Sequence, residues 1–436
     1  MMFLPAEIYD HIAFQVEDPP SSDDRHELHH GEATRYQSRE YLQRLSVLRL
    51  VNKAFCRSAS IRLFRDFKAT IGSRRNPNNR WLVSWLSAIS NSPHAGLVRR
   101  LSIGYDEVGF TEDSDWEPGS AFCQYAEDLS SLLPAILNRL SNLQILHVYG
   151  PSLSAVDPKV EAHMKIFTEA IVTALSYAQL PRLTELNLQF PHTHEFGKLL
   201  CDHPTTIQIP IENVLRQLNH FEVSVAEFTT EDGQPFGWFP PSALSSVYPN
   251  AQFASRLLRV IELAENLKSL SFRNRDLLNI DPLQLERFNR LQFLDLHRVS
   301  ISAEKLIQLV LQCKESLTRI RFCLVELNSG TWKDVFVQLL ELPGLVFFYV
   351  FWGTYSSTGD SSHLRPRDLS YEDEPEELSS MLGVNDYDAL GDLQRHVNAV
   401  RRASGMPLMT EMEFRCLRDP IRVPGREGLQ LGYSSV

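Results

Sequence analysis

Residues 267–272, Leu-Lys-Ser-Leu-Ser-Phe, carry the apolar pattern on which the fold prediction rests. It places apolar residues in the order apolar, two residues, apolar, one residue, apolar. The same order returns at 291–296 (Leu-Gln-Phe-Leu-Asp-Leu), 317–322 (Leu-Thr-Arg-Ile-Arg-Phe) and 345–350 (Leu-Val-Phe-Phe-Tyr-Val), so that the starts are 24, 26 and 28 residues apart. Alternating apolar residues indicate a β-strand with one buried face. Their return at nearly constant intervals indicates stacked structural units.

Four earlier copies of the pattern begin at Val98, Leu143, Leu183 and Leu218, at wider intervals of 35 to 49 residues. Most copies follow a stretch with helical periodicity. These stretches are residues 129–140, 164–175, 257–264, 303–311 and 332–340. Each unit is therefore expected to hold one helix and one strand, which places the chain in the α/β fold class.

This organisation resembles the leucine-rich repeat family in an irregular form, because the asparagine that the family carries two positions after the last apolar residue is absent. The resemblance implies a solenoid with parallel strands on a concave face and helices outside. We expect the solenoid over residues 80–416, capped by a helix near 388–402, and a C-terminal tail at 417–436. Three segments within it have the composition of long loops: 104–124, 226–252 and 353–386.

Residues between and just after the apolar positions of each strand should point to the concave surface, because successive side chains of a strand face opposite ways. In the later units these positions mix aromatic residues with arginine, which is typical of the residues that dominate binding at protein interfaces. An inserted loop could instead cover some of the aromatic residues. The expected partner-binding side chains are Tyr149, Arg273, Phe293, His297, Arg319, Arg321 and Tyr349.

The N-terminal region follows a different pattern. The segment Leu-Pro-Ala-Glu at 4–7 begins a helix, in which proline suits the first position, and Ile8 and Ile12 share one face of that helix. Residues 17–40 are polar and contain a Pro-Pro pair, and helical periodicity resumes over 42–55. On periodicity alone, these short helices would simply cap the solenoid.

The order of residues is more informative than the periodicity. Leu-Pro-x-Glu-Ile-x-x-x-Ile, then Leu-Arg-Leu-Val-Asn-Lys-Ala-Phe, then Leu-Phe-Arg, all within residues 4–67, resembles the F-box family in the form common in fungal proteins. The resemblance implies that residues 1–70 form a helical module that binds a Skp-type adaptor. The insertion at 17–40 departs from the family, but a polar loop costs little closure entropy. The residues implied to contact the adaptor are Leu4, Pro5, Ile8, Ile12, Val51, Phe55, Leu63 and Phe64.

Together the two resemblances imply a substrate-recognition subunit of an SCF-type (Skp–cullin–F-box) ubiquitin ligase. The F-box would bind the adaptor, and the solenoid would hold a protein substrate near the ubiquitin-loaded conjugating enzyme, so that proximity alone promotes transfer. Such a subunit is not an enzyme and needs no cofactor. The alternative is a repeat scaffold without ligase activity, whose N-terminal helices only cap the solenoid.

One motif points to a different chemistry. His26-Glu27-Leu28-His29-His30 matches the H-E-x-x-H signature of zinc metalloproteases, in which His26 and His30 would bind zinc and Glu27 would act as the base. That site needs a helix with an apolar back, whereas here the motif follows a stretch rich in proline, serine and aspartate. We expect a solvated loop with no metal, and a zinc metallohydrolase is kept as a remote alternative.

Composition limits the setting in which the protein works. The chain has 436 residues and a formal net charge of −11, which disfavours nucleic acid and anionic membranes as main partners. The N-terminus lacks the basic segment of a secretory signal, and no apolar run is long enough to span a membrane. The six cysteines are scattered without a C-x-x-C motif. These observations favour a cytoplasmic or nuclear location.

Overall fold

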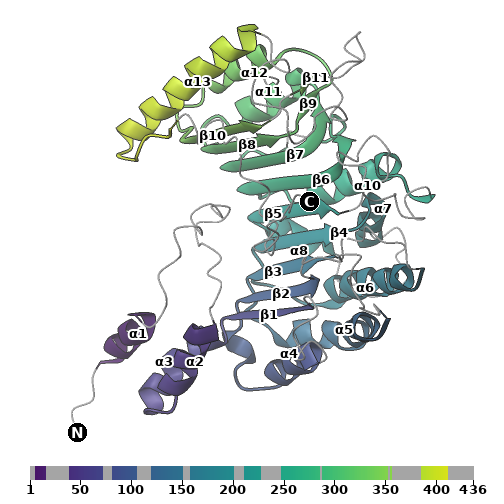
Figure 1. Ribbon diagram of the computed structural model, residues 1–436, viewed down its shortest axis with the longest axis vertical. Helices are drawn as coiled ribbons and strands as arrows, with labels where there is room; N and C mark the ends of the chain where they lie inside the picture. Colours follow the sequence, from purple (N-terminus) through teal and green to yellow (C-terminus); the bar gives the residue numbers. More distant parts are fainter. Residues whose placement is uncertain are drawn as a thin grey trace, which may run out of the picture.

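The computed structural model is organised around one long β-sheet whose strands follow one another in chain order (Figure 1). It describes residues 5–15, 39–71, 81–105, 119–150, 158–200, 211–226, 247–284, 287–351, 354–355 and 384–410. The strands of these ranges are β1 (Asp66–Ile71), β2 (Arg100–Tyr105), β3 (Ile145–Tyr149), β4 (Glu185–Phe190), β5 (His220–Val225), β6 (Ser269–Asn279), β7 (Phe293–Ile301), β8 (Arg319–Cys323), β9 (Glu326–Leu327), β10 (Phe347–Phe351) and β11 (Thr354–Tyr355). All their pairings are parallel, which confirms the predicted α/β class.

The repeated apolar pattern sets the register of the sheet. In all eight copies the second apolar residue pairs with the second of the next copy, and the third pairs with the third. The second positions are Leu101, Leu146, Leu186, Phe221, Leu270, Leu294, Ile320 and Phe348, and the third are Ile103, Val148, Leu188, Val223, Phe272, Leu296, Phe322 and Val350. All of these except Val350 are buried. A continuous register therefore forms without the asparagine that regular repeats carry.

The sheet begins earlier than the sequence indicated. Strand β1 pairs with β2 along its whole length, which aligns Phe67 and Ala69 with the second and third apolar positions of β2. Phe64, Phe67 and Ala69 therefore form a further copy of the pattern, with a weak signal because its third apolar residue is only an alanine. The segment predicted to be a helical module up to residue 70 ends in a strand, and the repeat structure starts before residue 80.

Helices connect the strands and stack in chain order along one side of the sheet, as α4, α5 and α6 do in Figure 1. The longer helices are α4 (Leu82–Ser90), α5 (Gly119–Arg139), α6 (Pro158–Tyr177), α8 (Ile211–Gln217), α10 (Asn250–Glu262), α11 (Ala303–Gln312) and α12 (Trp332–Leu339), with short turns at α7 (Thr193–Phe196), η3 (Ala95–Leu97) and η4 (Gly197–Leu199). The five stretches of predicted helical periodicity coincide with α5, α6, α10, α11 and α12. Their apolar faces and the apolar strand positions form one continuous core.

The last repeats have an aromatic core between strand and helix. Trp332 and Phe336 of α12 are fully buried and stack on each other at 5.5 Å between ring centroids. Phe348 of β10 meets Phe336 edge-on at 5.8 Å, and Phe322 of β8 lies 5.9 Å from Trp332. Aromatic side chains bury large areas and favour such tilted contacts. This packing fixes α12 to the end of the sheet.

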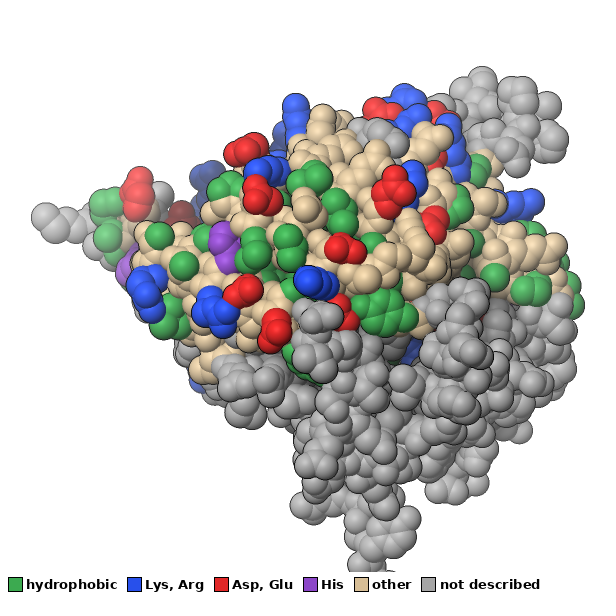
Figure 2. Space-filling model, turned by 90° about the horizontal axis from the view of Figure 1, so that it is seen from above, with side chains coloured by type: hydrophobic (Ala, Val, Ile, Leu, Met, Phe, Trp, Pro, Cys, Tyr) green, Lys and Arg blue, Asp and Glu red, His purple; other side chains and the backbone are tan. Residues whose placement is uncertain are grey.

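Helix α13 (Val384–Ala403) covers the C-terminal end of the sheet, where the sequence predicted a capping helix. Its first turn is tied to α12, because Asp386 accepts hydrogen bonds from the Lys333 backbone N–H at 2.9 Å and from the Tyr355 hydroxyl at 2.7 Å. The Tyr355 hydroxyl in turn accepts from the Trp332 N–H at 3.0 Å. Seen from this end, acidic and basic side chains are interspersed with apolar ones (Figure 2). A mixed polar surface is what the terminal unit of a solenoid requires.

The three predicted insertions prove shorter at their edges than the sequence indicated. Strand β2 extends through residue 105, and α5 already begins at 119, inside the segment predicted as a loop over 104–124. Helix α10 begins at 250, and α13 begins at 384. Strand β11 lies inside the predicted loop at 353–386, and α2 begins at 39, inside the predicted insertion at 17–40. Most of the remaining residues of the predicted loops, residues 17–38 and the tail at 417–436 lie outside the described residues.

In the described ranges, three helices precede the sheet: α1 (Ala6–Gln15), α2 (Arg39–Leu48) and α3 (Lys53–Leu63). Helix α3 begins where the Asn52 side chain accepts a hydrogen bond from the Phe55 N–H at 2.9 Å, which satisfies an N–H that has no partner within the helix. Tyr41 and Leu45 of α2 bury against Ala59 of α3. On another side of α3, the ring of Phe55 meets Tyr9 of α1 edge-on at 4.8 Å. We call these three helices the helical module.

Candidate functional site

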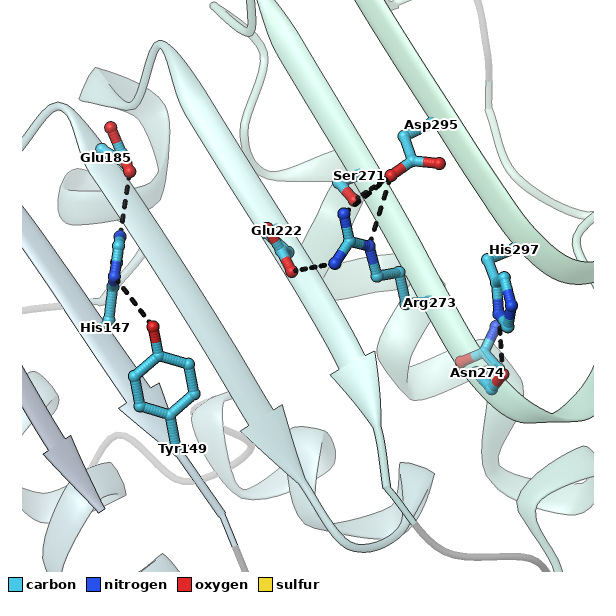
Figure 3. Close-up of polar contacts among 9 residues, drawn as sticks. All are labelled: His147, Tyr149, Glu185, Glu222, Ser271, Arg273, Asn274, Asp295 and His297. Atoms are coloured by element: carbon cyan, nitrogen blue, oxygen red, sulfur yellow. Dashed lines mark hydrogen bonds and ion pairs between the residues drawn. The ribbon is translucent and has the colours of Figure 1, made fainter. Parts of the chain in front are cut away.

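The residues between the apolar positions project from the face of the sheet that points away from the helices. We call this face, from β3 to β10, the polar face. Figure 3 shows its side chains lying along neighbouring strands and bonding across them. Alternation places them there, because the apolar residues of the same strands are committed to the helical side. The polar face is therefore the surface that the sequence predicted to be concave and partner-binding.

An ion network lies at the centre of the polar face. The guanidinium of Arg273 in β6 donates to Asp295 Oδ2 in β7 from Nε at 3.2 Å and from Nη2 at 3.0 Å. Its Nη1 lies 3.4 Å from Glu222 Oε1 in β5, and Ser271 donates to Asp295 at 3.1 Å. Burial alone would lower the pKa of Arg273, but the carboxylates of Glu222 and Asp295 outweigh burial and raise it. The cation thus joins three strands and is fully matched by two anions.

Arg321 of β8 is placed beside this network. It is the cross-strand neighbour of Asp295 on one side and of Tyr349 on the other. Its guanidinium lies over the Tyr349 ring, 5.3 Å from the centroid, in a cation–π contact. Burial opposes its charge, but Asp295 together with Cys323 and Tyr349 raises the pKa of Arg321. Among the described residues no carboxylate forms an ion pair with Arg321, although the negative charge of the neighbouring Asp295 still acts on it.

A separate pair of side-chain hydrogen bonds, centred on His147, lies on strands β3 and β4. His147 of β3 bonds Glu185 of β4 through Nε2 at 2.9 Å, and its Nδ1 lies 3.2 Å from the Tyr149 hydroxyl. A carboxylate only accepts, so Nε2 of His147 carries a proton in its bond to Glu185. Tyr149 is thereby fixed two strands away from the Arg273 network (Figure 3). The structure does not bring Tyr149 together with the other predicted partner-binding residues.

The remaining predicted residues of the polar face differ in accessibility. Arg319, Arg321 and Tyr349 are partly exposed on the adjacent strands β8 and β10. His297 is also partly exposed, bonds the Asn274 carbonyl at 3.2 Å, and has its pKa lowered to about 4, mainly by burial. Phe293 is only 8% exposed, so little of its side chain is accessible to a partner.

Glu222 belongs to the ion network but was not among the predicted site residues. It occupies the position between the second and third apolar residues of its repeat, which is the position that Asp295 and Arg321 hold in theirs. The position could have been found from the pattern. Its pairing with Arg273 could not, because the two residues are 51 positions apart in the chain.

A second buried polar cluster lies where β4 ends and α7 begins. His192 is 1% exposed, and neither ring nitrogen has a hydrogen-bond partner among the described residues. Burial lowers the pKa of His192 to about 4 and raises that of Glu195 to about 7. Nearby, Asn250 donates to Asp276 at 2.8 Å and accepts from the Thr193 N–H at 2.9 Å. This cluster anchors α7 to α10 and opens to no surface, so it is not a candidate binding site.

The residues predicted to contact an adaptor fall into two groups. Pro5, Ile8, Ile12 and Val51 are exposed on the helical module, with Val51 62% exposed. Phe55, Leu63 and Phe64 are half-buried by contacts within the chain: Phe55 with Tyr9, Leu63 with the α2–α3 core, and Phe64 stacked on His94 at 4.4 Å. Leu4 lies outside the described residues. The exposed apolar surface is larger than predicted and also includes Phe14, Val47, Leu50 and Ile61.

The zinc-protease motif at His26, Glu27 and His30 lies outside the described residues. Within the ranges that the structure describes, no group of three or more histidine, cysteine, aspartate or glutamate residues could hold a metal ion. In the same ranges, no helix is both long and apolar enough to cross a membrane.

Comparison with known proteins adds no assignment. No family model matches the chain, and no curated protein is detectably similar to it in sequence. The two candidate surfaces, the apolar surface of the helical module and the polar face of the sheet, therefore stand on their residues and geometry alone.

Proposed function

We propose that this protein is a substrate-recognition subunit of an SCF-type ubiquitin ligase, in which the helical module is an F-box that binds a Skp-type adaptor and the sheet is an irregular leucine-rich-repeat solenoid that binds a protein substrate. In this proposal the chain supplies no catalytic group and no cofactor. The protein works in the cytoplasm or nucleus, where the adaptor and the cullin are found.

The observation that carries the proposal is the exposed apolar surface of the helical module. Leu50 is 85% exposed, Val51 62% and Ile8 42%. Exposed apolar side chains that cluster on one small module mark an interaction site, and a module of three short helices has too little interior to bury them all. A groove on a helical adaptor would cover such a surface.

The polar face supports the second half of the proposal. It combines arginine and aromatic side chains on adjacent strands, a composition enriched at protein interfaces. It is also carried by a rigid sheet with a continuous core, so a bound substrate would be held in a defined orientation relative to the helical module. Proximity and orientation are what a receptor subunit contributes to transfer.

The test is co-purification of the full chain with a Skp-type adaptor after co-expression. The double variant Ile8→Glu and Val51→Glu places two charges on the exposed apolar surface without touching the internal contacts of Phe55 or Leu63. It should abolish co-purification, because burying an unpaired carboxylate at an interface costs several kcal/mol. The matched control is Leu311→Glu on α11, which is 42% exposed, as Ile8 is, and lies outside the module.

Two outcomes would contradict the proposal. Failure of the wild-type chain to retain the adaptor would favour a repeat scaffold without ligase activity. Equal retention of the adaptor by wild type and double variant would show that the exposed apolar surface is not the contact.

A further inference from the structure

The polar face changes in charge from one end to the other. The positions that face this side on β3, β4 and β5 include the carboxylates of Glu185 and Glu222 and no lysine or arginine. The corresponding positions on β8 and β10 include no carboxylate. They are Arg319, Arg321 and Cys323 on β8, and Phe347, Tyr349 and Phe351 on β10. We call the two arginines and three aromatic residues of this group the β8–β10 patch.

The patch is accessible, since all five of its residues are partly exposed. It is also cationic in a chain whose net charge is −11. The two arginines sit two positions apart on one strand, so both guanidinium groups reach the same side of the sheet. Aromatic side chains flank them on the neighbouring strand, which gives an apolar floor beside the charges.

Arg321 is prepared to bind an anion. Its guanidinium is positioned by the Tyr349 ring at 5.3 Å, so little side-chain entropy remains to be lost on binding. Unlike Arg273, which is matched by Glu222 and Asp295, it has no carboxylate within ion-pair distance among the described residues. An arginine held in this way forms strong, often bidentate bonds to a carboxylate.

We propose that the β8–β10 patch binds an acidic segment of the substrate protein, with an aspartate or glutamate carboxylate on Arg321 and an apolar side chain against the aromatic residues. This inference rests on the proposed function, because it names the chemistry of the substrate that the polar face receives. Carboxylate is favoured over phosphate because Asp295 stands directly across from Arg321 and would repel a doubly charged group more strongly.

The test is fluorescence anisotropy with the full chain and short labelled peptides of glutamate, phenylalanine and glycine. The glutamate peptide should bind, and the same peptide with glutamine in place of glutamate should bind more weakly by roughly tenfold, as expected for the loss of a charge-assisted hydrogen bond. Arg321→Gln should weaken the glutamate peptide to a similar extent. Arg321→Lys should retain part of the affinity, because it keeps the charge but loses the planar fork.

The matched control is Arg182→Gln, an exposed arginine before β4 and away from the patch, which should leave binding unchanged. A salt titration of the wild-type chain tests the role of charge without any variant. Added salt should weaken binding of the glutamate peptide and leave binding of the glutamine peptide unchanged. Equal binding of the glutamate and glutamine peptides, or no effect of Arg321→Gln, would overturn the proposal. Tighter binding of a phosphoserine peptide would overturn the choice of carboxylate.

Two further outcomes separate this inference from others. Peptide binding with loss of adaptor co-purification would leave the patch intact and contradict the ligase function, whereas adaptor retention without peptide binding would contradict the patch alone. If the peptide binds only after the carboxylates of the chain's own acidic run at 372–377 are neutralised, the occupant is that run, and the proposed external segment is overturned.

Discussion

Replacing Asp295 with asparagine should destabilise the protein by breaking the ion network of the polar face. The Asp295 side chain is 2% exposed and accepts hydrogen bonds from Arg273 at 3.0 and 3.2 Å and from Ser271 at 3.1 Å. Removing one partner of a buried ion pair costs roughly 3–5 kcal/mol. Here Glu222 stays 3.4 Å from the guanidinium, and the Arg273 side chain is 34% exposed and can be partly rehydrated. We therefore expect a loss of about 2–3 kcal/mol, below that range.

Thermal unfolding followed by circular dichroism measures the effect. A loss of this size should lower Tm by about 2–3 °C, because an unfolding entropy of ~2.1 cal/mol/K per residue amounts to roughly 0.9 kcal/mol/K for a chain of 436 residues. Asp388→Asn is the matched control, because Asp388 is exposed on α13, and it should leave Tm unchanged. The double variant Asp295→Asn and Arg273→Gln should lose less stability than the sum of the losses of the two single variants, because both partners of the ion pair are removed together. A Tm of Asp295→Asn equal to that of the control would refute the reasoning.

Three other perturbations test separate features. Gly104→Ala should prevent stable folding, with a loss of unfolding free energy above roughly 4 kcal/mol. The φ of Gly104 is +120°, and a Cβ there would lie 1.9 Å from the Tyr149 carbonyl oxygen. Gly405→Ala is the control, because Gly405 has φ +70° and no neighbour within 4 Å of an added Cβ, and it should lower Tm much less. Asp386→Ala should cost about 2 kcal/mol and speed amide exchange in α13, because two partly buried donors lose their acceptor; unchanged exchange would contradict the tie to α12. Burial lowers the pKa of His192 from 6.5 to about 4, so between these values the unfolded chain binds the proton that the folded chain excludes. Stability should thus fall as the pH drops through this window, and melts of His192→Gln should show a shallower fall.

The positions of the strands could be predicted from the sequence because the evidence for each is local. A strand with one buried face needs apolar residues at every second place, and this requirement is visible at residues 267–272 without reference to any other unit. The helices could be predicted for the same reason, because the spacing of their apolar residues is also visible within each segment. The start of the sheet was less visible, because Ala69 is a weak apolar signal and Phe64 fitted a second pattern equally well.

The α/β class, the register positions and the set of residues that face away from the helices can be derived from local sequence patterns. Which of those residues act together depends on the tertiary structure. Arg273 is matched by carboxylates from two other strands, Arg321 lies over an aromatic ring and forms no ion pair among the described residues, and Phe293 is buried. The physical reason is that alternation along one strand fixes the direction of a side chain, whereas its charge balance and accessibility depend on neighbours that lie tens of residues away in the chain.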